Sequence, residues 1–123
     1  MFRDTKPFSG FAVDDLEKAK SFYGGTLGLE VAEEHGLLHL KLGSGAAVLV
    51  YPKPNHEPAT FTILNFPVAD IEAAVADLRA AGVEFEQYEG DLQTDEQGIF
   101  RGEGPPIAWF RDPSGNILSV LEQ

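Results

Sequence analysis

The stretch Phe11-Ala12-Val13-Asp14-Asp15-Leu16-Glu17-Lys18-Ala19 returns 55 residues later as Phe66-Pro67-Val68-Ala69-Asp70-Ile71-Glu72-Ala73-Ala74. Both copies fit the frame Phe-x-Val-x-Asp-[Leu/Ile]-Glu-x-Ala. Each copy is typical of the end of a strand followed by an aspartate-capped helix start. The chain is therefore predicted to contain two copies of one structural unit.

The repetition continues beyond this frame in the same order. Gly28-Leu29-Glu30-Val31 is answered by Gly82-Val83-Glu84-Phe85 at an offset of 54, and Leu42-Gly43-Ser44-Gly45 by Asp112-Pro113-Ser114-Gly115 at an offset of 70. The larger offset requires an insertion in the second copy. Residues 88–105 are the place where we expect it.

Composition limits the classes of protein that fit. The 123 residues suit one domain, in which repeat units at about residues 5–52 and 59–123 share a sheet or core. Twenty acidic against nine basic residues give a net charge of -11, which disfavours nucleic-acid and anionic-membrane partners. No apolar run approaches the ~18 residues of a membrane span, and residues 1–7 lack a signal-peptide core, so a cytoplasmic location is expected. The absence of cysteine excludes disulfides, thiolate metal sites and cysteine nucleophiles.

Apolar periodicity and turn residues predict the elements of each unit. In the first, we expect a strand at 7–13, a helix that starts at Asp14 or Asp15 and ends at Gly24-Gly25, and strands at 29–34, 37–42 and 46–51. In the second, we expect a strand at 60–68, a helix from Asp70 to Gly82, and strands at 83–87, 106–111 and 116–122. The fold class is α+β, with two tandem βαβββ units.

The long polar segment 91–105 contains one apolar pair, Ile99-Phe100. Loops of this length in a compact domain often carry function. Two interpretations remain open. The segment is either a disordered excursion with one apolar anchor, or a lid in which Ile99, Phe100 and Arg101 fold over a pocket.

Three motifs in order resemble one superfamily: Val13 to Tyr23, Leu27-Gly28-Leu29-Glu30-Val31, and Phe110-Arg111-Asp112-Pro113-Ser114-Gly115-Asn116. Together with the duplication, they are similar to the vicinal oxygen chelate group, which includes glyoxalase I, the bleomycin-resistance proteins and the extradiol dioxygenases. The resemblance implies a single domain over residues 1–123, in which two βαβββ units form curved mixed sheets around a cup.

The resemblance also implies where a divalent metal would be bound in metal-dependent members. The four corresponding positions, on the first and last strand of each unit, carry Phe8, Leu49, Ile63 and Ser119. Three of these side chains offer no ligand atom, and a lone serine is not a metal site. We therefore expect no metal and no cofactor.

Strand pairing places further residues in the cup. If residues 112–116 form a five-residue turn, Trp109 faces Ser119, and its neighbours Arg111 and Ile107 face Ile117 and Leu121. The offset of 70 makes His39 the counterpart of Trp109. His39 is then either a strand histidine at a wet edge or a ligand contact. The face against the helices is predicted to carry Leu38, Leu40, Ala108, Phe110, Leu118 and Val120.

These placements give an aromatic cup with a few polar anchors, which is the usual composition of a small-molecule site. The predicted ligand-binding residues are Phe8, His39, Tyr51, Asn65, Phe100, Arg101, Trp109 and Ser119. The alternative is that side chains simply fill the cup as core.

Three functions remain possible. The leading prediction is a metal-independent small-molecule-binding protein that sequesters an aromatic or cationic compound. The second is a glyoxalase-like lyase or isomerase without the usual metal site, for which His39 is the one general base that can be suggested and no catalytic pair can be assigned. The third is a non-catalytic dimeric interaction module. A homodimer is expected in any case, because open sheet edges and the apolar Phe2, Phe8 and Ile99-Phe100 lack partners in one copy.

Overall fold

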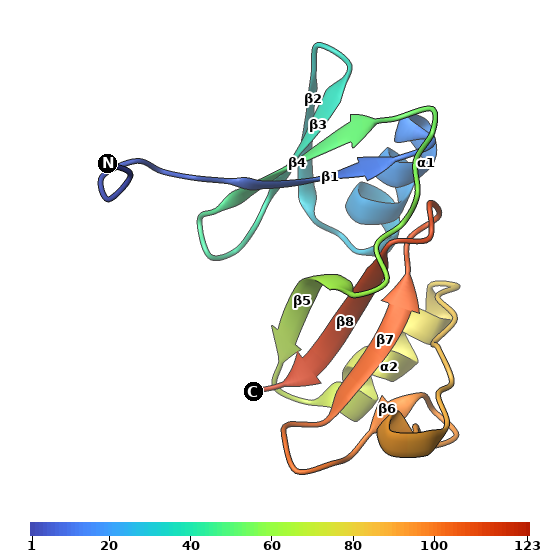
Figure 1. The fold of residues 1–123 in the computed structure, drawn as a ribbon. Coiled ribbons are helices and arrows are strands. Elements are labelled where there is room, and N and C mark those ends of the chain that lie inside the picture. The colour runs from blue at the N-terminus through green and yellow to red at the C-terminus, as the bar shows by residue number, and fades with distance from the viewer. The chain divides into compact units, whose positions relative to one another are not determined.

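The computed structural model describes all 123 residues, which divide into two compact units, Met1–His56 and Glu57–Gln123. Each unit contains a four-stranded mixed sheet with a helix against one of its faces (Figure 1). Each unit is therefore a βαβββ-like arrangement, and the predicted α+β class is confirmed. No helix in the structure has both the length and the apolar character needed to cross a membrane.

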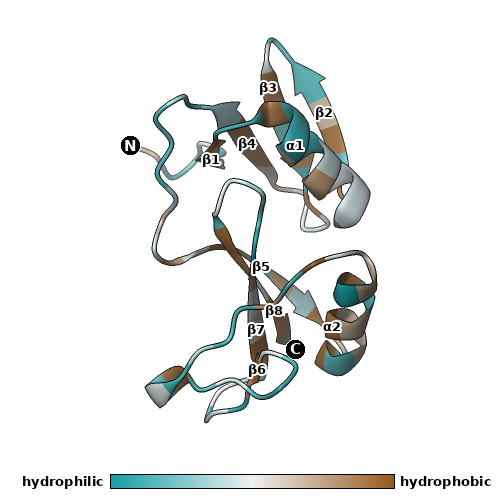
Figure 2. Ribbon diagram, turned by 90° about the vertical axis from the view of Figure 1, so that its right-hand side faces the viewer, coloured by the Kyte–Doolittle hydropathy of each residue, from teal (hydrophilic) through white to brown (hydrophobic).

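Unit 1 follows the predicted element order. Its elements are β1 (Ser9–Val13), α1 (Leu16–Lys20), the π-helical turn η1 (Ser21–Thr26), β2 (Glu30–Glu34), β3 (Leu37–Lys41) and β4 (Ala47–Pro52). The strand order is β1-β4-β3-β2, with β1 parallel to β4 and the other pairs antiparallel. In Figure 2, β3 and β4 are largely hydrophobic, whereas the end of β2 is hydrophilic.

The core of unit 1 lies between the helical side of this sheet and α1. Val13, Leu38 and Val50 have no exposed surface, and the ring of the buried Tyr23 lies 5.6 Å from that of Phe11. Burial of such side chains provides the main driving force for folding. The opposite face of the sheet, with no helix of its unit against it, is called the open face below.

The predicted helix end at Gly24-Gly25 is wrong, because the π-helical turn η1 runs through both glycines. The Leu27 N–H donates to the Phe22 carbonyl at 2.8 Å, which closes the wider turn. The chain reverses instead at Gly28, where φ is +73°, a conformation that glycine adopts without a steric penalty.

Unit 2 has the same arrangement of elements as unit 1, except at the sheet edge where unit 1 has β2. Its elements are β5 (Thr62–Val68), α2 (Ile71–Ala80), the 3₁₀ turn η2 (Gly90–Leu92), β6 (Ile99–Phe100), β7 (Ile107–Arg111) and β8 (Ile117–Glu122). The strand order is β5-β8-β7-β6, and β5 runs parallel to β8. Ile71 and Val75 of α2 are buried, as are Phe110 and Leu118 of the sheet.

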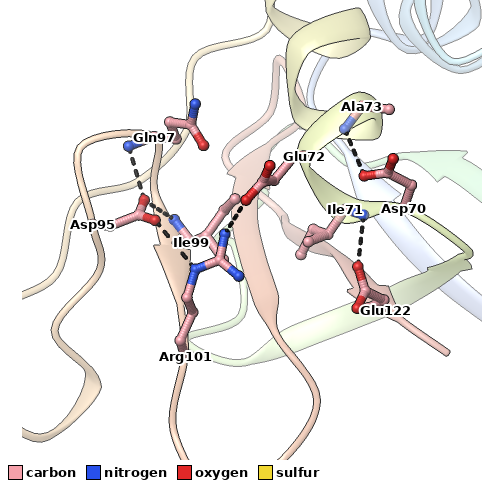
Figure 3. Close-up of polar contacts among 9 residues, drawn as sticks. All are labelled: Asp70, Ile71, Glu72, Ala73, Asp95, Gln97, Ile99, Arg101 and Glu122. Atoms are coloured by element: carbon pink, nitrogen blue, oxygen red, sulfur yellow. Dashed lines mark hydrogen bonds and ion pairs between the residues drawn. The ribbon is translucent and has the colours of Figure 1, made fainter.

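Aspartates cap both helices, as the repeated frame predicts. The Asp15 carboxylate accepts from the Lys18 N–H, and the Asp70 carboxylate accepts from the Ala73 N–H, each at 3.1 Å. In unit 2 the Glu122 carboxylate also accepts from the Ile71 N–H at 3.1 Å (Figure 3). Two acidic side chains therefore satisfy N–H groups at the start of α2, which have no partner within the helix.

The strand predicted at residues 83–87 is not formed. Only Phe85 bridges to β7, opposite Phe110, and the Glu86 N–H donates to the Trp109 carbonyl at 2.8 Å. The rest of this edge of β7 is paired with β6. Two separate segments therefore occupy the place that the continuous strand β2 holds in unit 1.

Pairing registers locate the insertion that interrupts this edge. Val31 and Glu33 of β2 lie opposite Leu40 and Leu38, and their counterparts Phe85 and Ile99 lie opposite Phe110 and Ala108. One residue separates the first pair, whereas thirteen separate the second. The extra twelve residues, 87–98, are called the insertion below.

The hairpin between β7 and β8 has the predicted register, with Trp109 opposite Ser119 and its neighbours Arg111 and Ile107 opposite Ile117 and Leu121. The buried Asp112 carboxylate holds the turn, since it accepts from the backbone N–H groups of Ser114 and Asn116, each at 2.9 Å. All six residues predicted to face the helices are buried: Leu38, Leu40, Ala108, Phe110, Leu118 and Val120.

Candidate functional site

The open face of unit 2 carries a pocket beside Trp109. Its volume is about 620 Å³, which lies within the usual range for small-molecule sites. It is lined by Thr60, Phe61, Thr62, Tyr88, Glu89, Asp91, Leu92, Trp109 and Ile117. The lining comes from the start of β5, from the insertion and from the β7–β8 hairpin.

Aromatic rings form one wall of this pocket. The Tyr88 ring meets the Trp109 ring edge-on, with centroids 5.3 Å apart. The Phe100 ring is a second neighbour of Trp109, with its centroid 6.3 Å from that of Trp109, but it does not line the pocket. Phe61 and Leu92 are 67% and 49% exposed, which is unusual for large apolar side chains and typical of a surface that binds something.

The insertion is held in place by hydrogen bonds within it. The Thr94 hydroxyl accepts from the Tyr88 N–H at 3.0 Å and donates to the Gln87 side-chain carbonyl at 3.1 Å. The Thr94 N–H in turn donates to the Tyr88 carbonyl at 3.1 Å. These bonds fix the backbone of Tyr88 and so place its ring against Trp109.

The charge around the pocket is negative. Glu89 and Asp91 are its two charged lining residues. Arg111 lies nearby on β7, but its guanidinium pairs with the Glu86 carboxylate and donates to the Gly115 carbonyl at 3.2 Å. The hydrogen bond that Arg111 donates to the Glu86 carboxylate raises the pKa of Arg111, so this cation stays charged and paired.

Tyr88 remains a neutral phenol at physiological pH. Burial raises the pKa of its hydroxyl, the nearby Glu86 carboxylate adds to the rise, and Arg111 offsets part of it. The pocket therefore presents a hydroxyl group that can donate or accept a hydrogen bond.

Ser119 and Asn65, predicted as polar anchors, bond to each other. Ser119 is fully buried, and its hydroxyl donates to the Asn65 side-chain carbonyl at 2.5 Å. The two residues are also backbone partners in the β5–β8 pair. Neither lines the pocket beside Trp109.

The lid predicted at Ile99, Phe100 and Arg101 is wrong, because this segment is built into the sheet. Ile99 is 1% exposed and pairs with Ala108, and Phe100 pairs with Ile107. Strand alternation places Phe100 on the open face and the residues on either side of it on the helical face. In the alternative interpretation, the apolar anchor is confirmed by the same pairing, whereas hydrogen bonds of Thr94 and Asp95 order the residues before it.

Arg101 accordingly points away from Trp109, toward α2. Its guanidinium pairs with Glu72 at 2.8 Å and with Asp95 at 3.5 Å (Figure 3). This bridge links the end of β6, the insertion and the first turn of α2. The hydrogen bonds that Asp95 accepts from Gln97 and Ile99, each at 2.9 Å, close the insertion at its C-terminal end.

The predicted site residues of unit 1 lie on or before its sheet. His39 is partly buried and lies opposite Leu49, as the offset predicts. Tyr51 is 38% exposed at the end of β4, and Phe8, directly before β1, is 70% exposed. Their roles as ligand contacts stay predictions.

The residues present do not fit a metal. Neither unit gathers three or more histidine, cysteine, aspartate or glutamate side chains that could hold an ion. Phe8, Leu49 and Ile63 have no ligand atoms, and the Ser119 hydroxyl is already engaged by Asn65.

Sequence reasoning found Trp109 but missed most of the pocket, including Phe61, Tyr88 and Leu92. Tyr88 and Leu92 lie outside the periodic segments on which strand and helix assignments depend, whereas Phe61 falls in the strand predicted at 60–68 but lies one residue before β5 in the structure. The sequence feature that could have pointed to this wall was Tyr88-Glu89, an aromatic residue beside a carboxylate, directly after the segment that aligns with β2.

Comparison with known proteins gives the family. Residues 8–120 match the Glyoxalase/Bleomycin resistance protein/Dioxygenase superfamily. A mitochondrial methylmalonyl-CoA epimerase of Bos taurus is 32% identical, and the alignment covers 91% of this chain and 70% of the relative.

Solved structures agree in fold. A glyoxalase family protein from Enterococcus faecalis has a TM-score of 0.73 at 26% identity, over 99% of this chain and 100% of that one. TnmS3, an antibiotic binding protein from Streptomyces sp. CB03234, has a TM-score of 0.70 at 23% identity, over 97% of each chain. The resemblance inferred from the three motifs is thus confirmed, and the chain belongs to the glyoxalase/bleomycin resistance protein/dioxygenase superfamily.

Proposed function

We propose that this protein is a metal-independent binding protein that sequesters a small aromatic compound in the pocket beside Trp109. The observation that carries the proposal is the aromatic wall formed by Trp109 and Tyr88, with Phe61 exposed at the same pocket. Flat aromatic guests gain stacking or edge-on contacts from such rings in addition to the burial of apolar area.

Two further observations support a binding role. The positions at which metal-dependent relatives would hold an ion carry Phe8, Leu49, Ile63 and Ser119, so the usual catalytic centre of the superfamily has no ligands here. TnmS3, which shares the fold, is an antibiotic binding protein, so this architecture is compatible with holding an organic guest.

Tryptophan fluorescence provides the test, because Trp109 is the only tryptophan in the chain. Titration with a panel of aromatic compounds should quench or shift its emission for at least one of them. Trp109→Ala should then weaken binding of that compound by about 2–4 kcal/mol, measured by equilibrium dialysis. Phe2→Ala, which removes an exposed ring from unit 1, is the control and should bind normally.

The proposal fails if no compound changes the emission and Trp109→Ala unfolds the protein. Trp109 would then be a core residue of unit 2. Trp109→Phe separates the two roles further, because it keeps an aromatic wall while removing the indole N–H.

An epimerase or isomerase activity is the second candidate, favoured by the 32% identity to the Bos taurus methylmalonyl-CoA epimerase. Such a reaction needs a group that moves a proton, and His39 is the base that the sequence suggests. We expect no epimerisation and no deuterium uptake when the protein is incubated with methylmalonyl-CoA in D₂O. Turnover that disappears in His39→Ala would replace binding as the function.

A homodimer is part of the same proposal. The edge strands β1 and β2 in unit 1 and β5 and β6 in unit 2 each have one side without a strand partner. Phe2 and Phe8 are 74% and 70% exposed. Light scattering at micromolar concentration should give twice the 13.4 kDa chain mass, and a monomer mass would contradict the dimer.

A further inference from the structure

The insertion contributes more to the pocket than any other segment. Four of the nine lining residues belong to it: Tyr88, Glu89, Asp91 and Leu92. Unit 1 has no equivalent, because β2 continues without interruption along β3. Whatever chemistry distinguishes the open face of unit 2 therefore depends largely on these twelve residues.

The charged side chains that line the pocket are all negative. The two charged lining residues are the carboxylates of Glu89 and Asp91, and no lysine, arginine or histidine lines the pocket. The nearby Arg111 is neutralised by Glu86. The local field therefore adds to that of the whole chain, whose net charge is -11.

These two carboxylates have no partner within the chain, whereas three other carboxylates of unit 2 are paired with arginines. Asp95 and Glu72 in the same unit are both bridged by Arg101, and Glu86 is taken by Arg111. Glu89 and Asp91 are exposed and can pair with a cation brought by a guest without breaking an existing bond.

The segment that carries them is preorganised. The 3₁₀ turn η2 is closed by the Gln93 N–H, which donates to the Gly90 carbonyl at 3.1 Å. Thr94 holds the other side of the segment through its bonds to Tyr88. A guest that binds here does not need to order the loop first, which reduces the entropic cost of binding.

The aromatic wall also favours positive charge. The faces of tryptophan and tyrosine rings attract cations, and the attraction increases when the cation is desolvated. Trp109 and Tyr88 lie in the same pocket as the two carboxylates, so one guest can contact both kinds of group.

We infer that the insertion makes the pocket selective for planar aromatic compounds that carry a positive charge, with Glu89 and Asp91 as the specificity-determining residues. This inference rests on the proposed function, since it assumes that the pocket beside Trp109 binds aromatic guests. It adds that the preferred guest is a cation, and it names the insertion as the segment that selects for this charge.

Three acridines of similar size test the charge class. 9-Aminoacridine is cationic at neutral pH, acridine is neutral and acridine-9-carboxylate is anionic. Their dissociation constants can be measured by quenching of Trp109 at low ionic strength. We expect 9-aminoacridine to bind about five- to tenfold more tightly than acridine, as two partly exposed carboxylates allow, and the anion to bind weakest.

A matched pair of variants tests the residues. In the double variant Glu89→Gln with Asp91→Asn, the preference for 9-aminoacridine over acridine should fall to within about twofold. The control is Glu84→Gln with Asp77→Asn, which removes the same charge from two exposed residues of unit 2 outside the pocket. It should keep the preference.

The outcomes distinguish a failure of the charge selectivity from a failure of the proposed binding function. Equal binding of all three acridines, or a preference that the control removes as fully as the pocket variant, overturns the charge selectivity and leaves aromatic binding in place. Failure of all three to bind overturns this inference, and titration with the wider aromatic panel then decides the proposed function separately. Circular dichroism of each variant shows whether the fold is retained.

Discussion

Thr94 is a small residue on which the shape of the pocket depends. It is 9% exposed, and its hydroxyl accepts from the Tyr88 N–H at 3.0 Å. Thr94→Val keeps the shape of the side chain but leaves that N–H without its partner, which should cost about 1–3 kcal/mol in the free energy of unfolding. It should also weaken aromatic binding, because Tyr88 is no longer held against Trp109.

Urea unfolding and Trp109 fluorescence titration measure the two effects of this change. Thr94→Ser restores the hydroxyl and should recover most of both. If Thr94→Val destabilises the protein but binds ligand normally, Thr94 supports the fold without positioning the pocket.

Gly98 is required where the insertion returns to the sheet. Its φ is +89°, and a Cβ there would lie 2.8 Å from the Phe85 Cβ and 3.3 Å from the Glu86 carbonyl oxygen. Gly98→Ala combines an unfavourable backbone conformation with a clash, so we expect a loss of more than about 1 kcal/mol in stability. Gly104→Ala, at a position with open space and no positive φ, is the control for thermal unfolding and should be close to neutral.

Alternation along strands is why some residues could be placed from sequence and others could not. The register that sets Trp109 opposite Ser119 follows from the hairpin turn, and the one that sets His39 opposite Leu49 follows from the offset between the units. Phe61 and Tyr88 lie outside regular strands, where no period restricts the direction of a side chain. The place of Tyr88 in the pocket is set by the hydrogen bonds of Thr94, which leave no pattern in the sequence.

The edge of the second sheet shows that sequence patterns can also fail to predict a whole strand. Val83 to Gln87 has the composition of a strand and aligns with β2, yet only Phe85 and Glu86 bond to β7. The insertion separates the two halves of this edge, and β6 supplies the second half. Sequence offsets could show that an insertion exists, but only the pairing showed that the chain leaves the sheet and rejoins it.

The bridge that ties β6, the insertion and α2 together should respond to acid. Burial raises the pKa of Asp95, but hydrogen bonds from the Ile99 and Gln97 N–H groups and the Arg101 guanidinium outweigh it, so the pKa lies below its ordinary value. A lowered pKa in the folded state means that this carboxylate stabilises the fold above the ordinary aspartate range and loses that effect as pH falls through the folded-state pKa.

Asp95→Asn should therefore lower stability at neutral pH, and its difference from wild type should shrink as pH falls below about 4. Urea unfolding at a series of pH values measures this difference. Asp77→Asn, on the exposed side of α2, is the control and should give only a small difference at neutral pH. A deficit for Asp95→Asn that stays constant down to acid pH would show that the loss arises from packing instead of charge.

On the scale of the whole molecule, the repeated Val-x-Asp frame was enough to predict the architecture. Val13 and Val68 end the first strands, and Asp15 and Asp70 cap the helices that follow. A duplicated unit gives each of these local signals twice, which strengthens the prediction of a strand followed by a capped helix in both copies. Function is not duplicated in this way, because the pocket depends on residues that only the second unit has.

The excess of acidic residues should also govern how the whole chain responds to salt. A net charge of -11 opposes compaction through self-repulsion, and ion pairs such as Lys20–Glu33 and Arg101–Glu72 offset it locally. Raising the ionic strength to about 0.15 M shortens the Debye length to roughly 8 Å, so repulsion between distant carboxylates is screened more than these close pairs are. The thermal unfolding midpoint at neutral pH should rise by a few degrees. Sodium chloride and tetramethylammonium chloride should act alike, since screening does not depend on the identity of the cation, whereas a rise with sodium alone would indicate a specific ion site.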